Sequence, residues 1–174
     1  MNFLSFSSFA DEFVGIIGAG VGKIKNQNNQ ILENGSKIFY GDTIIVGSKS
    51  TAQVLFLDQT VMTLGEDSEI TIDEFVYDPQ TNDGKFVSNI KSGTIKIITG
   101  KISKKDPDNL EIKIPTGAIG ARGTEFVVLA NSKNENTVLL LGPGPNNSLG
   151  MIPGNLEVTD GNNSVNIIQP GFET

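Results

Sequence analysis

Apolar and polar residues alternate with a period of two through much of the chain. The alternation is strict at residues 70–73, 94–97, 110–114 and 156–159. Because successive side chains of a β-strand point to opposite faces, each run predicts a strand with one face in a core and the other outward. Residues 52–57 and 138–141 are almost continuously apolar, which is typical of strands buried on both faces.

Turn-forming residues separate the apolar runs at short intervals. Examples are Asn-Gly at 34–35, Asp-Gly at 83–84 and 160–161, and Ser-Gly at 92–93. Asn, Asp and Gly accept the positive φ of tight turns, and helical periodicity is nearly absent. The sequence therefore predicts an all-β fold, a single domain of many short antiparallel strands. A β-sandwich and a β-roll or β-helix-like structure are both compatible with this pattern.

The composition narrows the functions that such a domain can have. The 174 residues fit one domain, and the net charge of -7 disfavours a nucleic-acid partner or an anionic membrane surface, since both attract a basic face. The chain has no histidine and no cysteine. This excludes Ser-His-Asp and Cys-His nucleophiles and the usual zinc, copper and haem sites. We expect no cofactor and no metal site.

Acidic residues between positions 58 and 74 are the remaining candidates for catalysis. A hydrolase can use two carboxylates as acid and base, and the segment holds Asp58, Glu66, Asp67, Asp73 and Glu74. However, Asp58 falls in a predicted hairpin turn, where Asp is common, and no convergent polar partners accompany the carboxylates. We interpret them as solvated surface and expect a protein that is not an enzyme and has no catalytic residues.

The first ten residues are a candidate export signal. Residues 3–9 include three phenylalanines and a leucine, and Ser8 and Ala10 stand where a signal peptidase requires small residues. The stretch is short and lacks a Lys or Arg at its start, so residues 1–10 are interpreted as a truncated signal peptide, with an N-terminal strand or tail as the alternative. No run of about 20 apolar residues occurs, so no membrane-spanning helix is expected.

Glycines recur through residues 117–128, GAIGARGTEFVV. A phosphate-binding loop is a poor interpretation, because no Lys-Ser or Lys-Thr pair and no helical pattern follow the glycines. The segment instead predicts a corner between two strands, made by glycine backbone conformations. Arg122 is expected to stabilise this corner by pairing with a carboxylate. Glu125, Asp58 and Glu74 are the candidate partners, and anion binding by Arg122 is the alternative.

Two further segments are candidates for protein contacts. Phe75 and Tyr77 flank Val76 and share one face of a predicted strand, either as core residues or as an exposed contact patch. Residues 142–154 contain three prolines, which are incompatible with a central strand and predict a loop. Such loops, like exposed strand edges, are where a non-enzymatic domain binds its partners.

Several motifs, taken in order, resemble the FecR domain, a bacterial periplasmic module. Residues 41–79, with Gly-Asp at the start and a strand ending in Phe-Leu-Asp, are similar to its first part, and residues 84–102 are similar to its next. Residues 112–128, IKIPTGAIGARGTEFVV, resemble its most recognisable signature. The structural motif within that signature consists of Gly120, Arg122, Gly123, Thr124 and Phe126. The resemblance extends over about residues 14–171, and it departs from the family at Gln59, where a glycine is usual, and in the order Pro-Thr.

The resemblance implies an all-β domain at residues 14–171 and a periplasmic location. The best-known FecR proteins carry a signal from an outer-membrane TonB-dependent transporter to a sigma factor. Because no membrane span is expected, the resemblance implies fold and compartment more directly than sigma-factor regulation.

We therefore expect an exported, non-enzymatic module, periplasmic or secreted, that binds an unidentified protein or supports the cell envelope. The alternatives are a periplasmic relay of the transporter signal and a ligand- or carbohydrate-binding β module.

Overall fold

The computed structural model describes residues 13–131 and 135–171, and the candidate signal peptide at residues 1–10 lies outside them. The described part is built almost entirely of strands, which confirms the all-β prediction. The strands are β1 (Phe13–Val21), β2 (Ile24–Asn26), β3 (Lys37–Phe39), β4 (Thr43–Val46), β5 (Thr51–Phe56), β6 (Val61–Leu64), β7 (Glu69–Tyr77), β8 (Gly84–Ile98), β9 (Leu110–Ile114), β10 (Gly117–Arg122), β11 (Glu125–Ala130), β12 (Thr137–Leu140), β13 (Asn155–Thr159) and β14 (Ser164–Ile167). A short helix, α1 (Lys101–Lys105), and a 3-10 turn, η1 (Pro107–Asn109), connect β8 to β9. None of the helices in the described ranges is long and apolar enough to cross a membrane.

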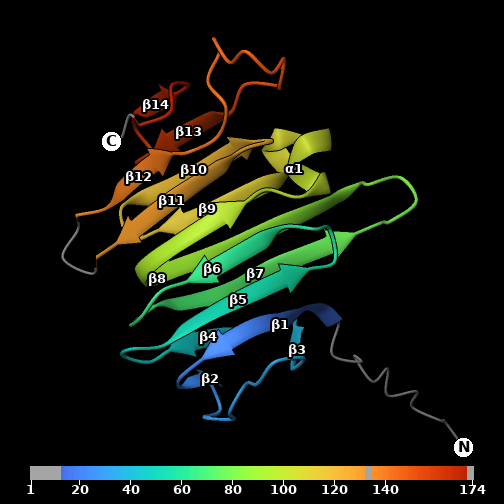
Figure 1. Ribbon diagram of the computed structural model, residues 1–174, viewed down its shortest axis with the longest axis vertical. Coiled ribbons are helices and arrows are strands. Elements are labelled where there is room, and N and C mark those ends of the chain that lie inside the picture. The colour runs from blue at the N-terminus through green and yellow to red at the C-terminus, as the bar shows by residue number, and fades with distance from the viewer. Residues whose placement is uncertain (1–12, 132–134, 172–174) are drawn as a thin grey trace, which may run out of the picture.

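The strands form two layers, and the long strand β8 belongs to both of them (Figure 1). The first layer has the order β3-β1-β5-β6-β8-β11-β12 and uses residues 93–98 of β8. The second layer has the order β2-β4-β7-β8-β9-β10-β13-β14 and uses residues 84–92. Among the described strands all neighbours are antiparallel except β8 and β9, which the helical connection allows to run parallel.

The two layers pack against each other through a continuous apolar core. Three phenylalanines bridge the layers: Phe56 from β5 lies 4.6 Å from Phe86 on β8 and 5.8 Å from Phe75 on β7, measured between ring centroids. Phe75 and Phe86 meet edge to face at 5.1 Å. Aromatic pairs at these separations add to the stabilisation that burial alone provides. The molecule is thus a β-sandwich in which one strand belongs to both layers.

Gly93 marks the point at which β8 passes from the second layer to the first. Its φ is +101°, and a Cβ added there would lie 2.1 Å from Ser68 Oγ and 2.5 Å from Ser68 Cα. An L-residue would therefore meet both an unfavourable backbone conformation and a direct clash. The Ser-Gly pair at 92–93, which reads as a hairpin turn, is instead a bend inside one 15-residue strand.

The prediction that residues 52–57 and 138–141 are buried on both faces is wrong. In β5 and β12 burial alternates, with one side chain in the core and the next facing outward. Nine outward apolar side chains of the first layer, here named the apolar face, are Ile16, Leu55, Leu57, Val61, Ile98, Val127, Leu129, Leu139 and Leu141. No described segment covers them, so these strands are apolar on both sides although only one side is in the core.

Replacement of Gly93 by alanine should be severely destabilising. We expect G93A to lower the free energy of unfolding by on the order of 3–5 kcal/mol, because it combines a left-handed φ with a backbone clash. The matched control is G161A, whose site has a φ of +91° and no neighbour within 4 Å, and which should cost about 1 kcal/mol. Chemical denaturation of both variants gives the two values, and equal losses would contradict the role assigned to the bend.

Candidate functional site

The signature segment crosses between the two layers. β10 lies in the second layer and β11 in the first, and only Gly123 and Thr124 connect them. Gly123 has a φ of +50°, whereas Gly120 lies inside β10 without a positive φ. Phe126, two residues beyond the crossing, is fully buried in the core. Thr124 is therefore preceded by Gly123, with its positive φ, and followed two residues later by the buried Phe126.

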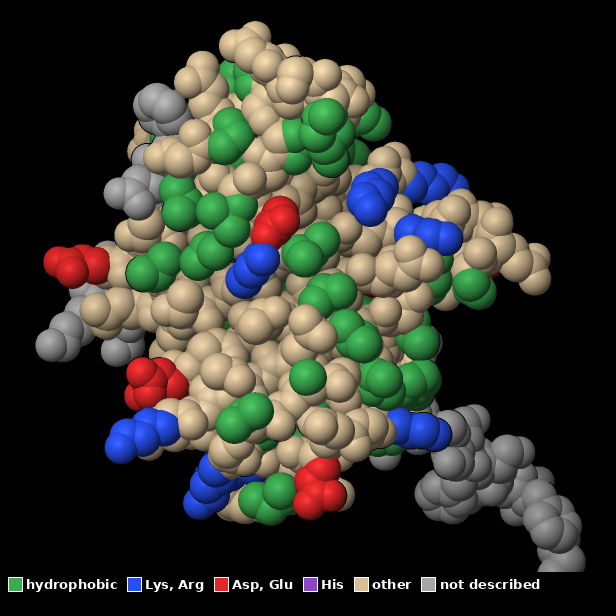
Figure 2. All heavy atoms as spheres, in the orientation of Figure 1, with side chains coloured by type: hydrophobic (Ala, Val, Ile, Leu, Met, Phe, Trp, Pro, Cys, Tyr) green, Lys and Arg blue, Asp and Glu red, His purple; other side chains and the backbone are tan. Residues whose placement is uncertain are grey.

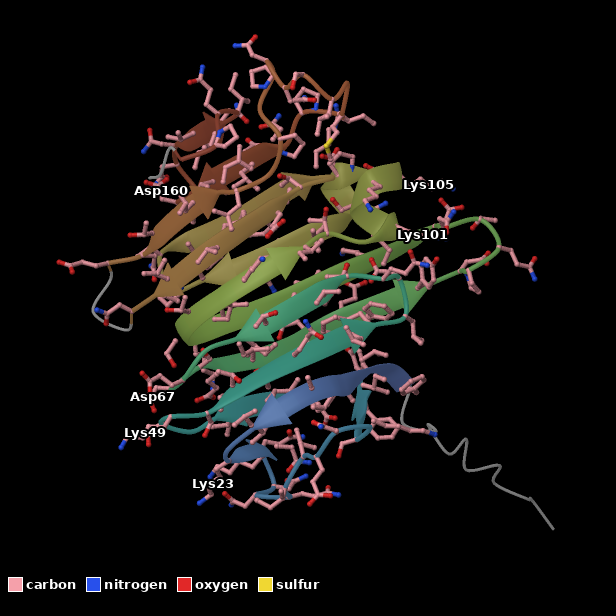
Figure 3. The ribbon with its side chains drawn as sticks, in the orientation of Figure 1. Lys23, Lys49, Asp67, Lys101, Lys105 and Asp160 are labelled. Atoms are coloured by element: carbon pink, nitrogen blue, oxygen red, sulfur yellow. The ribbon has the colours of Figure 1, made fainter. Side chains whose placement is uncertain are left out.

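Thr124 is bonded to the turn that follows β8. Its backbone N–H donates to Thr99 Oγ1 at 2.8 Å, and its C=O accepts from the Thr99 N–H at 3.0 Å. On the same side, Ser103 of α1 donates its hydroxyl to the C=O of Ala121 and accepts from the Gly123 N–H. Figure 3 shows α1, labelled at Lys101 and Lys105, beside this end of the layers. The helix thereby ties the crossing to the end of β8.

A buried carboxylate holds the other side of the same turn. Asp58, between β5 and β6, accepts from the Thr60 N–H at 3.0 Å and from the Thr60 hydroxyl at 2.8 Å. Thr60 Oγ1 in turn accepts from the Gly100 N–H at 3.0 Å, and the Asp58 C=O accepts from the Lys101 N–H at 2.8 Å. An added Cβ at Gly100 would lie 2.4 Å from both Thr60 N and Asp58 O, so the approach is close enough to require glycine.

These side chains form one cluster, here named the polar junction: Asp58, Thr60, Thr99, Ser103 and Thr124. They make up five of the nine buried polar residues in the described ranges, so buried polarity is concentrated at this point. The Thr124 hydroxyl has no hydrogen-bond partner among the described residues. The other four side chains of the cluster are hydrogen-bonded, so the junction connects three chain segments at a small desolvation cost.

Asp58 is 1% exposed, and this corrects its interpretation as part of a solvated surface. Burial raises the pKa of its carboxyl above the ordinary value of 3.8, although hydrogen bonds from Thr60 and from the Ile102 backbone N–H act in the opposite direction. The Asp58 carboxyl is therefore a structural group of the core that solvent does not reach.

The expected pairing of Arg122 with a carboxylate is not found. Arg122 is exposed and forms no ion pair with any described residue. Its three candidate partners have other contacts: Glu125 pairs with Lys96, Glu74 with Lys85, and Asp58 with Thr60. The corner is stabilised by threonine and serine hydroxyls, because the alternation along β10 directs Ile119 and Ala121 inward and Arg122 outward.

Gly120 and Arg122 line an open groove of about 640 Å³ on the second layer. Gly120 has open space where a Cβ would lie, and its cross-strand neighbours are Glu111 and Glu157. Seven of the seventeen lining residues are Asn, Asp or Glu and none is aromatic, whereas small-molecule sites are predominantly apolar and aromatic. The carboxylates of Asp108, Glu111 and Glu157 in the same lining also make the groove a poor anion site.

Phe75 and Tyr77 face the core. Phe75 is 2% exposed and offers no surface to a partner. Tyr77 packs at the edge of the core, and its hydroxyl donates to Asn82 Oδ1 at 2.8 Å. Of the two interpretations left open by the sequence, the core interpretation describes their positions.

Residues 142–154 form a loop whose two ends meet at the polar junction. A Cβ added to Gly142 would lie 2.0 Å from Thr124 Oγ1, and one added to Gly154 would lie 2.2 Å from the same atom. The Gly154 N–H donates to the Pro143 C=O at 2.8 Å. Thr124 thus lies between the first and last residues of the loop.

A family model described as FecR protein matches residues 42–142, more than half of the chain. The chain belongs to the FecR family. The match runs from β4 to β12 and contains the whole polar junction. Searches of curated proteins and of solved structures gave no match. Around the FecR match, β1 pairs with β5, and β13 pairs with β10, so the flanking strands extend the same two layers.

The sequence pointed to two of the junction residues and missed the rest. The Phe-Leu-Asp motif of the FecR resemblance marked Asp58, and the Arg-Gly-Thr motif marked Thr124. Thr60 lies only two residues after Asp58, but nothing in the sequence connected this turn to Gly100, or Thr99 and Ser103 to the crossing, because these contacts span 18–40 residues. Serine and threonine are common on protein surfaces, so the presence of these residue types did not indicate a buried cluster.

Replacement of Asp58 by asparagine should destabilise the protein in a pH-dependent manner. At neutral pH we expect D58N to lower the unfolding free energy by about 1–3 kcal/mol, since an amide nitrogen cannot accept the bonds that the second carboxyl oxygen accepts. The raised pKa means that Asp58 contributes stability that is fully present below pH 3.8 and is lost as the pH rises through the folded-state value.

The loss caused by D58N should therefore grow as the pH is lowered from 7 toward 4. Asp78, Asp83 and Asp160, whose pKa values are lowered by hydrogen bonds, weaken the fold on acidification in both proteins and cancel in the difference. Urea titrations of wild type and D58N across this pH range measure the difference between their unfolding free energies. A difference that shrinks on acidification would be inconsistent with a raised pKa.

Replacement of Arg122 by alanine should leave stability nearly unchanged. An exposed side chain without an ion pair is expected to change the unfolding free energy by no more than about 0.5 kcal/mol. T99V is the contrasting variant at the same corner, because it leaves the buried Thr124 N–H without its acceptor and should cost about 1–3 kcal/mol. Thermal and chemical denaturation compare the two, and a larger loss for R122A than for T99V would refute the assignment.

Proposed function

We propose that this chain is an exported FecR module that binds another protein, in the periplasm or at the envelope, through the loop at residues 142–154. In this proposal residues 14–171 act as one domain and carry no catalysis. FecR domains are known in periplasmic signal-transduction regulators, which supports a role in protein contacts. The observation that carries the proposal is the exposure of apolar side chains on this loop.

The loop presents the two most exposed large hydrophobic side chains in the described ranges. Leu149 is 80% exposed and Ile152 is 76% exposed, and Met151 between them is more than half exposed. Residues 142–154 contain no charged side chain, although the chain as a whole is acidic. Apolar side chains grouped on one projecting segment are typical of protein-binding sites.

The loop is held in shape before any partner binds. Asn147 Nδ2 donates to the C=O groups of Gly144 and Met151, each at 2.9 Å, and the Met151 N–H donates to Asn147 Oδ1 at 2.8 Å. In Figure 1 the loop projects beyond the ends of β10 and β13, at the top of the view. A loop already shaped by internal bonds loses less conformational entropy on binding. This supports recognition by the loop rather than by an unfolded segment.

Family membership favours a signalling partner as a second candidate function. The module would then relay the state of a TonB-dependent transporter toward a sigma-factor regulator, through contacts made by the same loop. Structural support of the envelope and signal relay differ in the partner and share the binding surface.

Replacement of Leu149 and Ile152 by serine should abolish partner binding without unfolding the protein. Both side chains are solvent-exposed, so the melting temperature of L149S/I152S should stay within a few degrees of wild type. Immobilised wild type and variant are compared for retention of envelope proteins from the source bacterium, identified by mass spectrometry. V21S is the matched control, since Val21 is also highly exposed and lies on β1, away from the loop. A partner retained equally by L149S/I152S would show that the loop is not the binding surface.

A further inference from the structure

The apolar face of the first layer extends over six strands. Cross-strand pairs place Ile16 beside Leu55, Leu55 beside Val61, and Val61 beside Ile98. Near the opposite edge of the same layer, Val127 on β11 pairs with Leu139 on β12. Four of the nine side chains are at least 40% exposed: Leu57, Ile98, Leu129 and Leu141. Figure 2 shows hydrophobic side chains spread over the face on which these strands lie.

One ion pair lies in the middle of this face. Lys96 Nζ is 2.5 Å from Glu125 Oε1, and the two side chains are 44% and 35% exposed. They are the only charged side chains at the described outward positions of β1, β5, β6, residues 93–98 of β8, β11 and β12. Ile98 is the cross-strand neighbour of Glu125, and Lys96 is that of Val127. The pair therefore separates two apolar halves of the face.

The charge of the face is complementary to a second copy of itself. The whole chain has a net charge of -7, so two copies repel each other over most approaches. The centre of the apolar face has one positive and one negative group, and Lys37 on β3, beside Ile16, adds a positive group at its edge, so the face lacks the acidic excess of the whole chain. A two-fold axis between Lys96 and Glu125 would bring the lysine of each copy to the glutamate of the other, as an isologous contact requires.

We propose that a second copy of this chain covers the apolar face, giving a two-fold dimer of β-sandwiches. The outward rows of the two first layers pack face to face, at the separation of about 10 Å that is usual for stacked sheets. Lys96 and Glu125 form a four-membered charge cluster across the axis, which sets the relative orientation of the copies. The loop at residues 142–154 begins directly after Leu141, at one end of the face, and its exposed residues Leu149, Met151 and Ile152 are not among those of the apolar face.

Charge reversal tests the dimer and its orientation together. K96E places two acidic groups at the centre of the face and E125K places two basic groups there, so each variant alone should dimerise at least about 10-fold more weakly than wild type. An equimolar mixture of K96E and E125K should recover the dimer, because the two altered faces attract each other. Sedimentation equilibrium over a range of concentrations measures the mass, which should be twice 18.6 kDa for wild type.

The matched control is K85E. Lys85 forms a comparable ion pair with Glu74 on the second layer, at 3.0 Å and with side-chain exposures of 50% and 39%. It should dimerise like wild type. L129S adds a variant without a charge change and should also weaken the dimer. Circular dichroism establishes that each variant is folded.

A wild type that stays monomeric up to about 100 μM, where any dimer with a Kd below about 10 μM would predominate, overturns the proposal. It is likewise overturned if K96E and E125K dimerise as K85E does, or if their mixture remains monomeric. The result is independent of partner binding through the loop, since L149S/I152S leaves the apolar face intact. Failure of the dimer and failure of the loop function are therefore distinguishable.

Discussion

The architecture depends on one strand that belongs to both layers. β8 supplies the central partner of β7 and β9 in the second layer and of β6 and β11 in the first. It changes layer at Gly93, where the backbone has a positive φ and lies against Ser68 so closely that no side chain fits. The bend brings Phe86, before it, to Phe56 across the core. Both the closure of the core and the position of the chain after β8 follow from this single residue.

The end of β8 delivers Thr99 and Gly100 to the polar junction. There the chain meets the β5–β6 turn through Asp58 and Thr60, and the crossing between β10 and β11 through Thr124. The Phe-Leu-Asp and Arg-Gly-Thr motifs of the FecR resemblance thus contribute Asp58 and Thr124 to one buried polar cluster. Their role is to hold three segments together, and the surfaces available for recognition lie at the loop and on the apolar face.

The alternation of residues predicted much of the fold but not the surroundings of its polar residues. The run at 110–114 coincides with β9, and the other alternating runs lie within β7, β8 and β13, because period-two burial is a local property of a strand. The length of β8 could not be predicted, since Ser-Gly at 92–93 has the composition of a hairpin turn. Nor could the burial of Asp58, which depends on residues some 40 positions later folding over it. The exposure of Arg122 could have been predicted, because Ile119 and Ala121 already indicate the inward face of β10.

The two ends of the loop at residues 142–154 meet on Thr124, and this makes the loop a replaceable part. Its ends stay side by side whatever lies between them, because Gly142 and Gly154 are packed against a side chain of the sandwich. The entropic cost of closing such a loop rises only slowly with its length. The same sandwich can therefore carry a longer, shorter or chemically different insert at this position. A change of binding specificity would then require new residues in one segment and no redesign of the layers beneath it.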